Sequence, residues 1–185
     1  MNDQSVKYLC ELIWQNSAEN PERRIFGLLD AARSDTIYPY LRDHVPTAQS
    51  LFQGSRAREL ALVSPYLMAL TPNQALSQWF FLNGWGRQWG ILCESTEAGN
   101  ILLRHFQKII AVYSDEGKPL YFRFYDPRVL KLYLQSATPD DLKKLFGPVA
   151  AFYVEGNTPD SLTQYILSSD RLVTRNLDLP DAVSG

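Results

Sequence analysis

The sequence predicts an α/β fold, a single domain in which a mixed β-sheet is flanked by helices. The length of 185 residues suits one compact domain. Hydrophobic residues make up 45% of the chain and charged residues 21%, which is typical of a globular protein and excludes disorder as its main state. Short apolar runs alternate with amphipathic stretches and one hairpin, a pattern typical of a mixed sheet between helices.

The first half of the chain begins with an amphipathic pattern. Val6, Leu9, Cys10 and Ile13 follow the i, i+3, i+4, i+7 spacing of one helix face. The elements expected after this helix are a buried strand over 25–32, a helix over 35–44, a strand over 48–52, a charged loop over 54–59 and an extended segment over 60–70. Within the extended segment Pro65 indicates an edge position or a bulge.

The rest of the chain contains three places where a capping residue is followed by proline, at Thr71, Asp126 and Thr138, and each predicts a helix start. A fourth such place at Thr158 suggests one more helix before a polar tail from Arg175. The remaining expected elements are a strand over 90–94, a helix over 97–108, a hairpin of strands 109–114 and 120–125 around the turn 115–117, and a strand over 149–154.

Charge and cysteine content exclude several classes of protein. Lys and Arg number 18 and Asp and Glu number 20, so the net charge of −2 lacks the basic footprint of non-specific nucleic-acid binding. Cys10 and Cys93 indicate neither a disulfide framework nor a zinc site. The first residues are not typical of a secretory signal, and no run reaches the ~20 apolar residues of a membrane span. We therefore expect a cytoplasmic protein without membrane insertion.

The reactive residue types form no recognisable catalytic or metal-binding pattern. His44 and His105 have no partner at metal-ligand spacing, and their positions favour ordinary surface or helix-end histidines. Serine lacks the GxSxG context of a hydrolase nucleophile. Cys93 is expected in a core strand, although its use as a thiol nucleophile stays open at this point. The prediction is a protein with no catalytic residue, no metal and no cofactor.

The segment GWGRQWG, residues 84–90, superficially suggests a phosphate-binding loop. It lacks the Lys-Ser/Thr ending of a P-loop, and the expected order is helix, loop, strand instead of strand, loop, helix. Two interpretations remain for Trp85 and Trp89 around Arg87. The indoles pack in the core at a helix-to-strand turn, which we favour, or they form an aromatic–arginine binding surface, because Trp and Arg dominate interface energetics.

The segment YFRFYDPR, residues 121–128, places Arg123 between two tyrosines, where it either pairs inside the fold or is displayed to a partner. The internal carboxylates available to it are Asp30, at the end of the first strand, and Asp126, which is more simply a helix cap. Arg128 is the better interface candidate on the exposed side of its helix. We thus expect Asp30, Arg123, Asp126 and Pro127 to be structural, and the candidates for partner binding are Trp85, Arg87, Trp89, Tyr125 and Arg128.

Six segments in this order resemble the adaptor/chaperone family of bacterial type VI secretion, a domain of unknown function. They are LLDAA, SPYLMAL, WGRQWGILCES, LLRHFQKI, YFRFYDPRVLKLYL and KLFGPV, and they span about residues 25–149. Residues that recur in the family pattern are found here as Asp30, Trp85, Gly86, Trp89, Gly90, Arg123, Tyr125, Asp126, Pro127 and Arg128. The family pattern contains no catalytic residues and implies no cofactor.

The resemblance implies a protein that binds a toxic effector in the cytoplasm and helps to load it onto the VgrG spike protein. It divides the chain into an N-terminal helix within residues 1–24, an adaptor core over 25–149 and a C-terminal segment over 150–185. The last segment matches the family less clearly, and such variability suits cargo recognition. The alternatives are an immunity protein that neutralises a toxin and a small hydrolase.

Overall fold

The structure is a computed structural model that describes residues 3–18, 22–72, 74–113, 119–156, 158 and 161–178. An α/β domain with helices flanking a sheet is confirmed. The elements are α1 (Asp3–Ala18), β1 (Arg24–Asp30), the 3₁₀ turn η1 (Ala31–Arg33), α2 (Ile37–His44), β2 (Gln49–Ser50), α3 (Ser55–Glu59), the 3₁₀ turn η2 (Ala61–Val63), β3 (Pro65–Leu70), α4 (Ala75–Asn83), β4 (Gly90–Ser95), α5 (Gly99–Ile110), β5 (Ala111–Tyr113), β6 (Pro119–Tyr121), α6 (Pro127–Ser136), α7 (Pro139–Phe146), β7 (Ala151–Glu155), β8 (Ser161–Ser168) and β9 (Arg171–Asp178).

The main sheet has seven strands in the order β2-β3-β1-β4-β7-β8-β9, and β5 and β6 form a separate two-stranded ladder. Every pairing in the described part of the chain is antiparallel, so the sheet differs from the expected mixture of strand directions. The central strand β1 runs against both of its neighbours, β3 and β4. At the β9 end, short connections between consecutive strands permit only antiparallel neighbours, because a parallel pair needs a long crossover.

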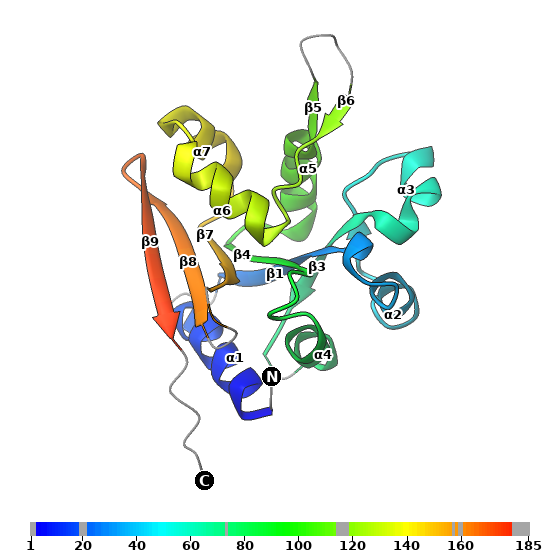
Figure 1. The fold of residues 1–185 in the computed structure, drawn as a ribbon, viewed down its shortest axis with the longest axis horizontal. Coiled ribbons are helices and arrows are strands. Elements are labelled where there is room, and N and C mark those ends of the chain that lie inside the picture. Colours follow the sequence, from blue (N-terminus) through cyan, green and yellow to red (C-terminus); the bar gives the residue numbers. More distant parts are fainter. Residues whose placement is uncertain are drawn as a thin grey trace.

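Helices cover both faces of the sheet (Figure 1), with α1, α2 and α4 on one side and α5, α6 and α7 on the other. Each face has its own hydrophobic cluster. In β1, Ile25 and Leu29 belong to the first cluster, and Phe26 and Leu28 belong to the second. This alternation follows from the two-residue period of a strand, and it explains why a strand buried on both faces reads as a continuous apolar run.

Helix α1 contributes one face to the core. Val6, Leu9 and Ile13 are buried on it, and Trp14 makes an edge contact with Phe81 of α4. The spacing of the buried residues is the expected amphipathic stripe. Among the described residues, no helix is long and apolar enough to cross a bilayer.

The predicted starts of α6 and α7 are confirmed by their caps. The Asp126 carboxylate accepts a hydrogen bond from the backbone of Arg128, and Pro127 occupies the first turn of α6. Thr138 and Asp141 form a reciprocal capping box at the start of α7. Gly147 ends α7 with a φ of 46°, a left-handed conformation that favours glycine.

Three local predictions were wrong in the first part of the chain and at the hairpin. Residues 55–59, expected in a loop, form the short helix α3. Helix α4 begins at Ala75 instead of after Thr71, whose carbonyl accepts a hydrogen bond from the Ser77 hydroxyl. Strand β6 ends at Tyr121, so 122–125 leave the ladder earlier than expected. The predicted turn over 115–117 lies outside the described residues.

The helix expected from Thr158 and the polar tail expected from Arg175 were also wrong, because this region forms the long strands β8 and β9. Thr158 resembles a helix cap in sequence, yet its hydroxyl contacts Ser161 at the start of β8. Ser169 and Asp170 connect the two strands with φ of 48° and 63°. Positive φ at two consecutive residues is typical of tight hairpin turns.

Candidate functional site

Three motifs that are far apart in sequence meet beyond the end of β1. The backbone N–H of Asp30 donates to the carbonyl of Trp89, which joins the end of β1 to the glycine-containing loop. The Arg33 guanidinium donates to the carbonyl and to the side-chain amide oxygen of Gln88 in that loop. The segment that precedes α6 completes the site. We name the following set the arginine–carboxylate cluster: Asp30, Arg33, Arg123, Asp126 and Arg128.

The ion pair between Asp30 and Arg123 anchors one side of the cluster. Asp30 is 1% exposed, and its Oδ2 lies 2.5 Å from Nη2 of Arg123. Its Oδ1 accepts the backbone N–H of Ala32 and thereby caps η1. Burial alone would lower the pKa of Arg123, but the hydrogen bond and the charge of Asp30 outweigh it and raise that pKa. Of the two internal partners considered for Arg123, Asp30 makes the contact.

Asp126 anchors the other side. Its two carboxylate oxygens accept hydrogen bonds from Nε and Nη2 of Arg128 at 3.0 and 2.7 Å, a bidentate arrangement, while Oδ1 also caps α6. Arg33 Nη2 lies 4.0 Å from the same carboxylate. Burial would raise the pKa of Asp126, but the hydrogen bonds from Arg128 and the charge of Arg33 lower it.

The cluster therefore combines two buried carboxylates with arginines that reach the surface. The side chains of Arg123 and Arg128 are 45% and 57% exposed, whereas those of Asp30 and Asp126 are almost fully covered. Each guanidinium pairs with a carboxylate on its buried side. This pairing orients the guanidinium, and its N–H groups on the exposed side can bind another molecule. Such an arrangement can recognise a carboxylate or a carbonyl group on another molecule.

The aromatic members of the candidate site lie in the core. Trp85 and Trp89 are each 5% exposed and Tyr125 is 3% exposed. Trp85 packs against Phe81, and Trp89 packs against Trp79. The indoles therefore occupy the packing position that the sequence favoured, while Arg87 of the same loop is exposed. Of the three residues of this loop that the sequence offered for partner binding, Arg87 alone has an exposed side chain.

A comparison with known families identifies the segment that carries this geometry. The model of the family described as "Domain of unknown function (DUF4123)" matches residues 25–144, more than half of the chain. The chain belongs to the DUF4123 family. No curated protein and no solved structure matches the chain. DUF4123 is associated with type VI secretion. The whole arginine–carboxylate cluster lies within the matched residues.

A carboxylate beyond the DUF4123 match occupies the glycine-containing loop. The Glu155 carboxylate at the end of β7 accepts the backbone N–H of Gln88 at 2.9 Å, and the backbone of Gly86 and Arg87 also stabilises its charge. Gly86 and Gln88 have φ of 77° and 59°, which turns successive N–H groups toward one anion. The loop thus cradles an anion, as its glycines superficially suggested, but the anion belongs to the chain itself.

Burial raises the pKa of Glu155 above its usual value, and the hydrogen bonds from the loop offset this only in part. Lys131 of α6 adds a favourable charge nearby and contacts the carbonyl of Gly156 at 3.4 Å. Sequence reasoning did not select Glu155. The available signal was an acid at the end of the otherwise apolar strand AFYVE, which requires a partner when it is buried.

A second carboxylate that sequence reasoning missed lies inside the sheet. Glu94 is 0% exposed, and it accepts hydrogen bonds from Arg23 at 2.8 Å and from the hydroxyl of Tyr153 at 2.6 Å. The amide of Gln164 donates to the same hydroxyl at 3.1 Å. These contacts run from Arg23, the residue before β1, through β4 to β7 and β8. A buried acid satisfied in this way stabilises a unique strand arrangement.

The potential reactive groups lie apart from one another. Cys93 is fully buried in β4, and burial raises the pKa of its thiol. The His105 ring interacts with the carbonyl of Leu145, and burial lowers its pKa. His44 contacts the ring of Tyr40 on α2. Within the described ranges, His, Cys, Asp and Glu form no group of three that could hold a metal ion.

Proposed function

We propose that this protein is an effector adaptor of type VI secretion, which binds a toxic effector in the cytoplasm and helps to load it onto the VgrG spike. The observation that carries the proposal is the DUF4123 match over residues 25–144. Binding would act by mass action, because a ligand that prefers one state of its partner shifts the partner toward that state. An adaptor needs no reaction of its own.

The arginine–carboxylate cluster supports this proposal chemically. Arginine is enriched at the centres of protein interfaces, and a side chain that is already held in place loses little conformational entropy on binding. Arg123 and Arg128 meet both conditions, because each pairs with a buried carboxylate and has a side chain that is about half exposed. Arg87 is exposed in the loop whose Gln88 is hydrogen-bonded to Arg33 of the cluster. We propose that these three arginines contact a partner protein.

We also propose that the protein is not an enzyme. A thiol nucleophile must ionise, and burial opposes the ionisation of Cys93. A general base must reach substrate, and the ring of His105 is engaged with the carbonyl of Leu145. Replacing Cys93 or His105 by a similarly sized neutral residue should leave partner binding unchanged.

The C-terminal segment 150–185 is proposed to choose the cargo. It lies beyond the DUF4123 match, and its strands β7 to β9 form one end of the main sheet. Strand β9 pairs with β8 on one side only, in the part of the chain that the structure describes. Exchange of residues 150–185 with those of a paralogue should exchange the effector that is bound. An unchanged effector would remove this part of the proposal.

The decisive experiment uses the tagged full chain in its own bacterium. Bound proteins are identified by mass spectrometry, and secretion of the identified effector is compared with and without the chain. We expect the effector and the spike protein to co-purify, and the effector to disappear from the secreted fraction when the chain is absent. The double variant Arg123→Ala/Arg128→Ala should reduce co-purification, while Arg42→Ala, which removes an exposed arginine of α2, serves as the control. Circular dichroism verifies that both variants are folded.

Two outcomes would contradict the proposal. Protection of cells against the bound toxin, without any effect on its secretion, would identify an immunity protein. Turnover of a small molecule by the purified chain, lost on Cys93→Ala, would identify a hydrolase. An adaptor changes neither the survival of cells exposed to the toxin nor the turnover of a small molecule. These measurements therefore distinguish the adaptor from an immunity protein and from a hydrolase.

A further inference from the structure

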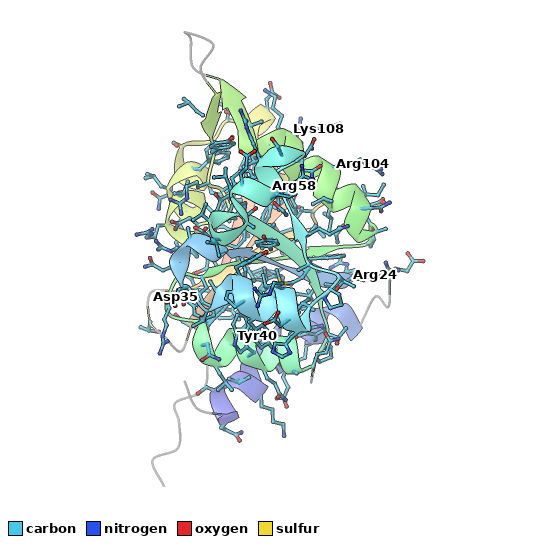
Figure 2. The ribbon with its side chains drawn as sticks, turned by 90° about the vertical axis from the view of Figure 1, so that its right-hand side faces the viewer. Arg24, Asp35, Tyr40, Arg58, Arg104 and Lys108 are labelled. Carbon is cyan, nitrogen blue, oxygen red and sulfur yellow. The ribbon has the colours of Figure 1, made fainter. Side chains whose placement is uncertain are left out.

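A second charged surface lies outside the arginine–carboxylate cluster, on helices α3 and α5. Its cations are Arg56 and Arg58 on α3, and Arg104 and Lys108 on α5, all exposed. Figure 2 shows Arg58, Arg104 and Lys108 in the upper half of one side of the molecule. We name the surface formed by these four side chains the basic face. Arg104 and Lys108 are four residues apart and therefore lie on one side of α5.

Specific contacts hold the two helices and the β5–β6 ladder together in this region. Arg56 Nη1 donates to the hydroxyl of Tyr121 in β6 at 2.9 Å. The side chain of Gln53, just before α3, donates to that of Gln107 in α5 at 2.7 Å. Residues from all three segments line a recess of about 210 Å³, whose walls include Phe52, Gln107 and Tyr121. The basic face therefore borders a defined depression.

The four cations of the basic face are not neutralised by an equal number of carboxylates on α3 and α5. Helix α5 contains no acidic residue, and α3 contains one, Glu59. None of the four cations is within ion-pair distance of a carboxylate among the residues the structure describes. The whole chain has a net charge of −2, so this local excess of positive charge is opposite in sign to the rest of the molecule. Such a surface attracts an acidic partner.

Apolar side chains accompany these cations. Leu120 is 51% exposed and Tyr121 is 39% exposed, and the Tyr121 ring contacts that of Phe52 with centroids 5.0 Å apart. Exposed aromatic and aliphatic groups beside a recess are typical of protein interfaces, where an apolar anchor is buried and charges form the rim. The basic face and its recess together match that composition.

We propose that the basic face binds an acidic segment of a partner protein, with an apolar side chain of that segment in the recess beside Tyr121. The carboxylates of the segment pair with Arg58, Arg104 and Lys108, and the anchor packs on Phe52 and Tyr121. This inference deepens the proposed function and rests on it, since it names the chemistry of the polypeptide that the adaptor binds. A nucleic acid fits the site less well, because the net negative charge of the chain repels a polyanion.

The test measures binding directly and requires no secretion. The probe is a fluorescein-labelled synthetic peptide rich in Asp and Glu with a central Leu-Phe pair, and fluorescence anisotropy follows its binding to the full chain. We expect binding that weakens with added salt, because exposed charges are screened over about 10 Å at 0.1 M salt. A matched peptide with Ser in place of Leu and Phe should bind more weakly.

The variant Arg58→Glu/Lys108→Glu should reduce the affinity at least about tenfold. The control Lys7→Glu/Lys144→Glu makes the same change of charge at two exposed lysines of α1 and α7 and should leave the affinity near that of the wild type. Circular dichroism and urea unfolding verify that both variants are folded. Peptide binding tests the basic face, whereas effector secretion, measured independently in the bacterium, tests the adaptor role. Failure of one can therefore be distinguished from failure of the other.

Three results would overturn the inference: no binding of the acidic peptide, an equal loss of affinity in the Lys7→Glu/Lys144→Glu control, or tighter binding of a single-stranded oligothymidine probe that competes with the peptide. Normal effector secretion by Arg58→Glu/Lys108→Glu together with lost peptide binding would leave the adaptor role intact and show that the peptide site serves no cargo. Loss of secretion without loss of peptide binding would show that Arg58 and Lys108 do not bind the acidic peptide, and would overturn the inference.

Discussion

The arginine–carboxylate cluster and the basic face carry the same kind of side chain in opposite electrostatic settings. In the cluster, Arg123 and Arg128 each pair with a carboxylate that is almost fully buried. On the basic face, four cations share one nearby acid and form no internal ion pair in the described structure. A buried carboxylate partner stabilises the fold and holds its arginine in place, whereas an exposed cation without such a partner can attract an acidic molecule.

Substitutions at the two sites should therefore have different effects on stability and on binding. Substitutions in the cluster should lower the free energy of unfolding, because they leave a buried charge without a partner or remove a helix cap. Substitutions on the basic face should change binding while the fold is unaffected. The following predictions go from the largest expected effect on stability to the smallest.

Asp126→Ala should lower the free energy of unfolding by about 2 kcal/mol, of which about 1 kcal/mol is the lost cap of α6 and the rest the lost bidentate pair with the half-exposed Arg128. Urea denaturation followed by circular dichroism measures it. Asp126→Asn keeps a capping oxygen without the charge and should lose about half as much. Wild-type stability in Asp126→Ala would show that the pair is not structural.

The pair between Asp30 and Arg123 should contribute a coupling energy of about 1 kcal/mol in a double-mutant cycle to Ala. Arg123→Ala alone should be destabilising, because Asp30 is 1% exposed and loses its counter-ion. The exposed pair Arg42–Asp43 is the matched control, and its cycle should show no measurable coupling. Equal coupling in the two cycles would contradict the distinction between buried and exposed carboxylates.

The pH dependence of stability should separate Asp126 from Glu155. The pKa of Asp126 is lowered by folding from its usual value of 3.8, so this group stabilises the protein above that pH and the stabilisation is lost as the pH falls through the lowered pKa. The pKa of Glu155 is raised from its usual value of 4.5, so its protonated form is favoured in the fold, and stability decreases as the pH rises from 4.5 through the raised pKa.

The comparison with Asp126→Asn and Glu155→Gln tests these signs in chemical denaturation at a series of pH values. Relative to Glu155→Gln, the wild type should become less stable as the pH rises above 4.5. Relative to Asp126→Asn, it should lose stability as the pH drops below 3.8. A wild type that gains stability over Glu155→Gln with rising pH would show that the loop more than compensates for burial.

Arg58→Ser/Lys108→Ser on the basic face should leave the urea midpoint unchanged, because both side chains are exposed and make no ion pair with the described residues. The same double variant should bind the acidic peptide more weakly and with a smaller dependence on salt. A shift of its midpoint comparable with that of Asp126→Ala would mean that the basic face, too, is part of the scaffold.

The parts of the fold that depend on neighbouring residues were predictable. Asp126 followed by Pro127, and Thr138 with Asp141, specify helix starts within four residues, and Gly147 specifies a stop. The candidate pair of Asp30 and Arg123 was also within reach, because an acid at a strand end and an arginine among aromatics both require a partner. The segment after Thr158 misled the prediction, since a cap-like residue does not reveal that a strand follows.

The partners of Glu94 and Glu155 could not be predicted, because no motif in the sequence marks the distant residues that these two acids contact. Glu94 binds Arg23 from 71 residues away, and Glu155 binds the backbone of Gln88 from 67 residues away. A single acid in an apolar strand signals only that a partner exists. Its identity depends on the strand order, and the strand directions differed from the expected mixture.

The contact between Glu155 and the loop around Gln88 restricts which C-terminal segments can replace residues 150–185. The loop lies within the DUF4123 match, whereas Glu155 lies beyond it, so the two halves of this contact come from opposite sides of the family boundary. A C-terminal segment that replaces residues 150–185 must place a carboxylate at the end of β7. Without it, the backbone N–H groups of the loop around Gln88 lose their acceptor. In the proposed exchange of residues 150–185, the positions free to change with the cargo are therefore those that follow Glu155.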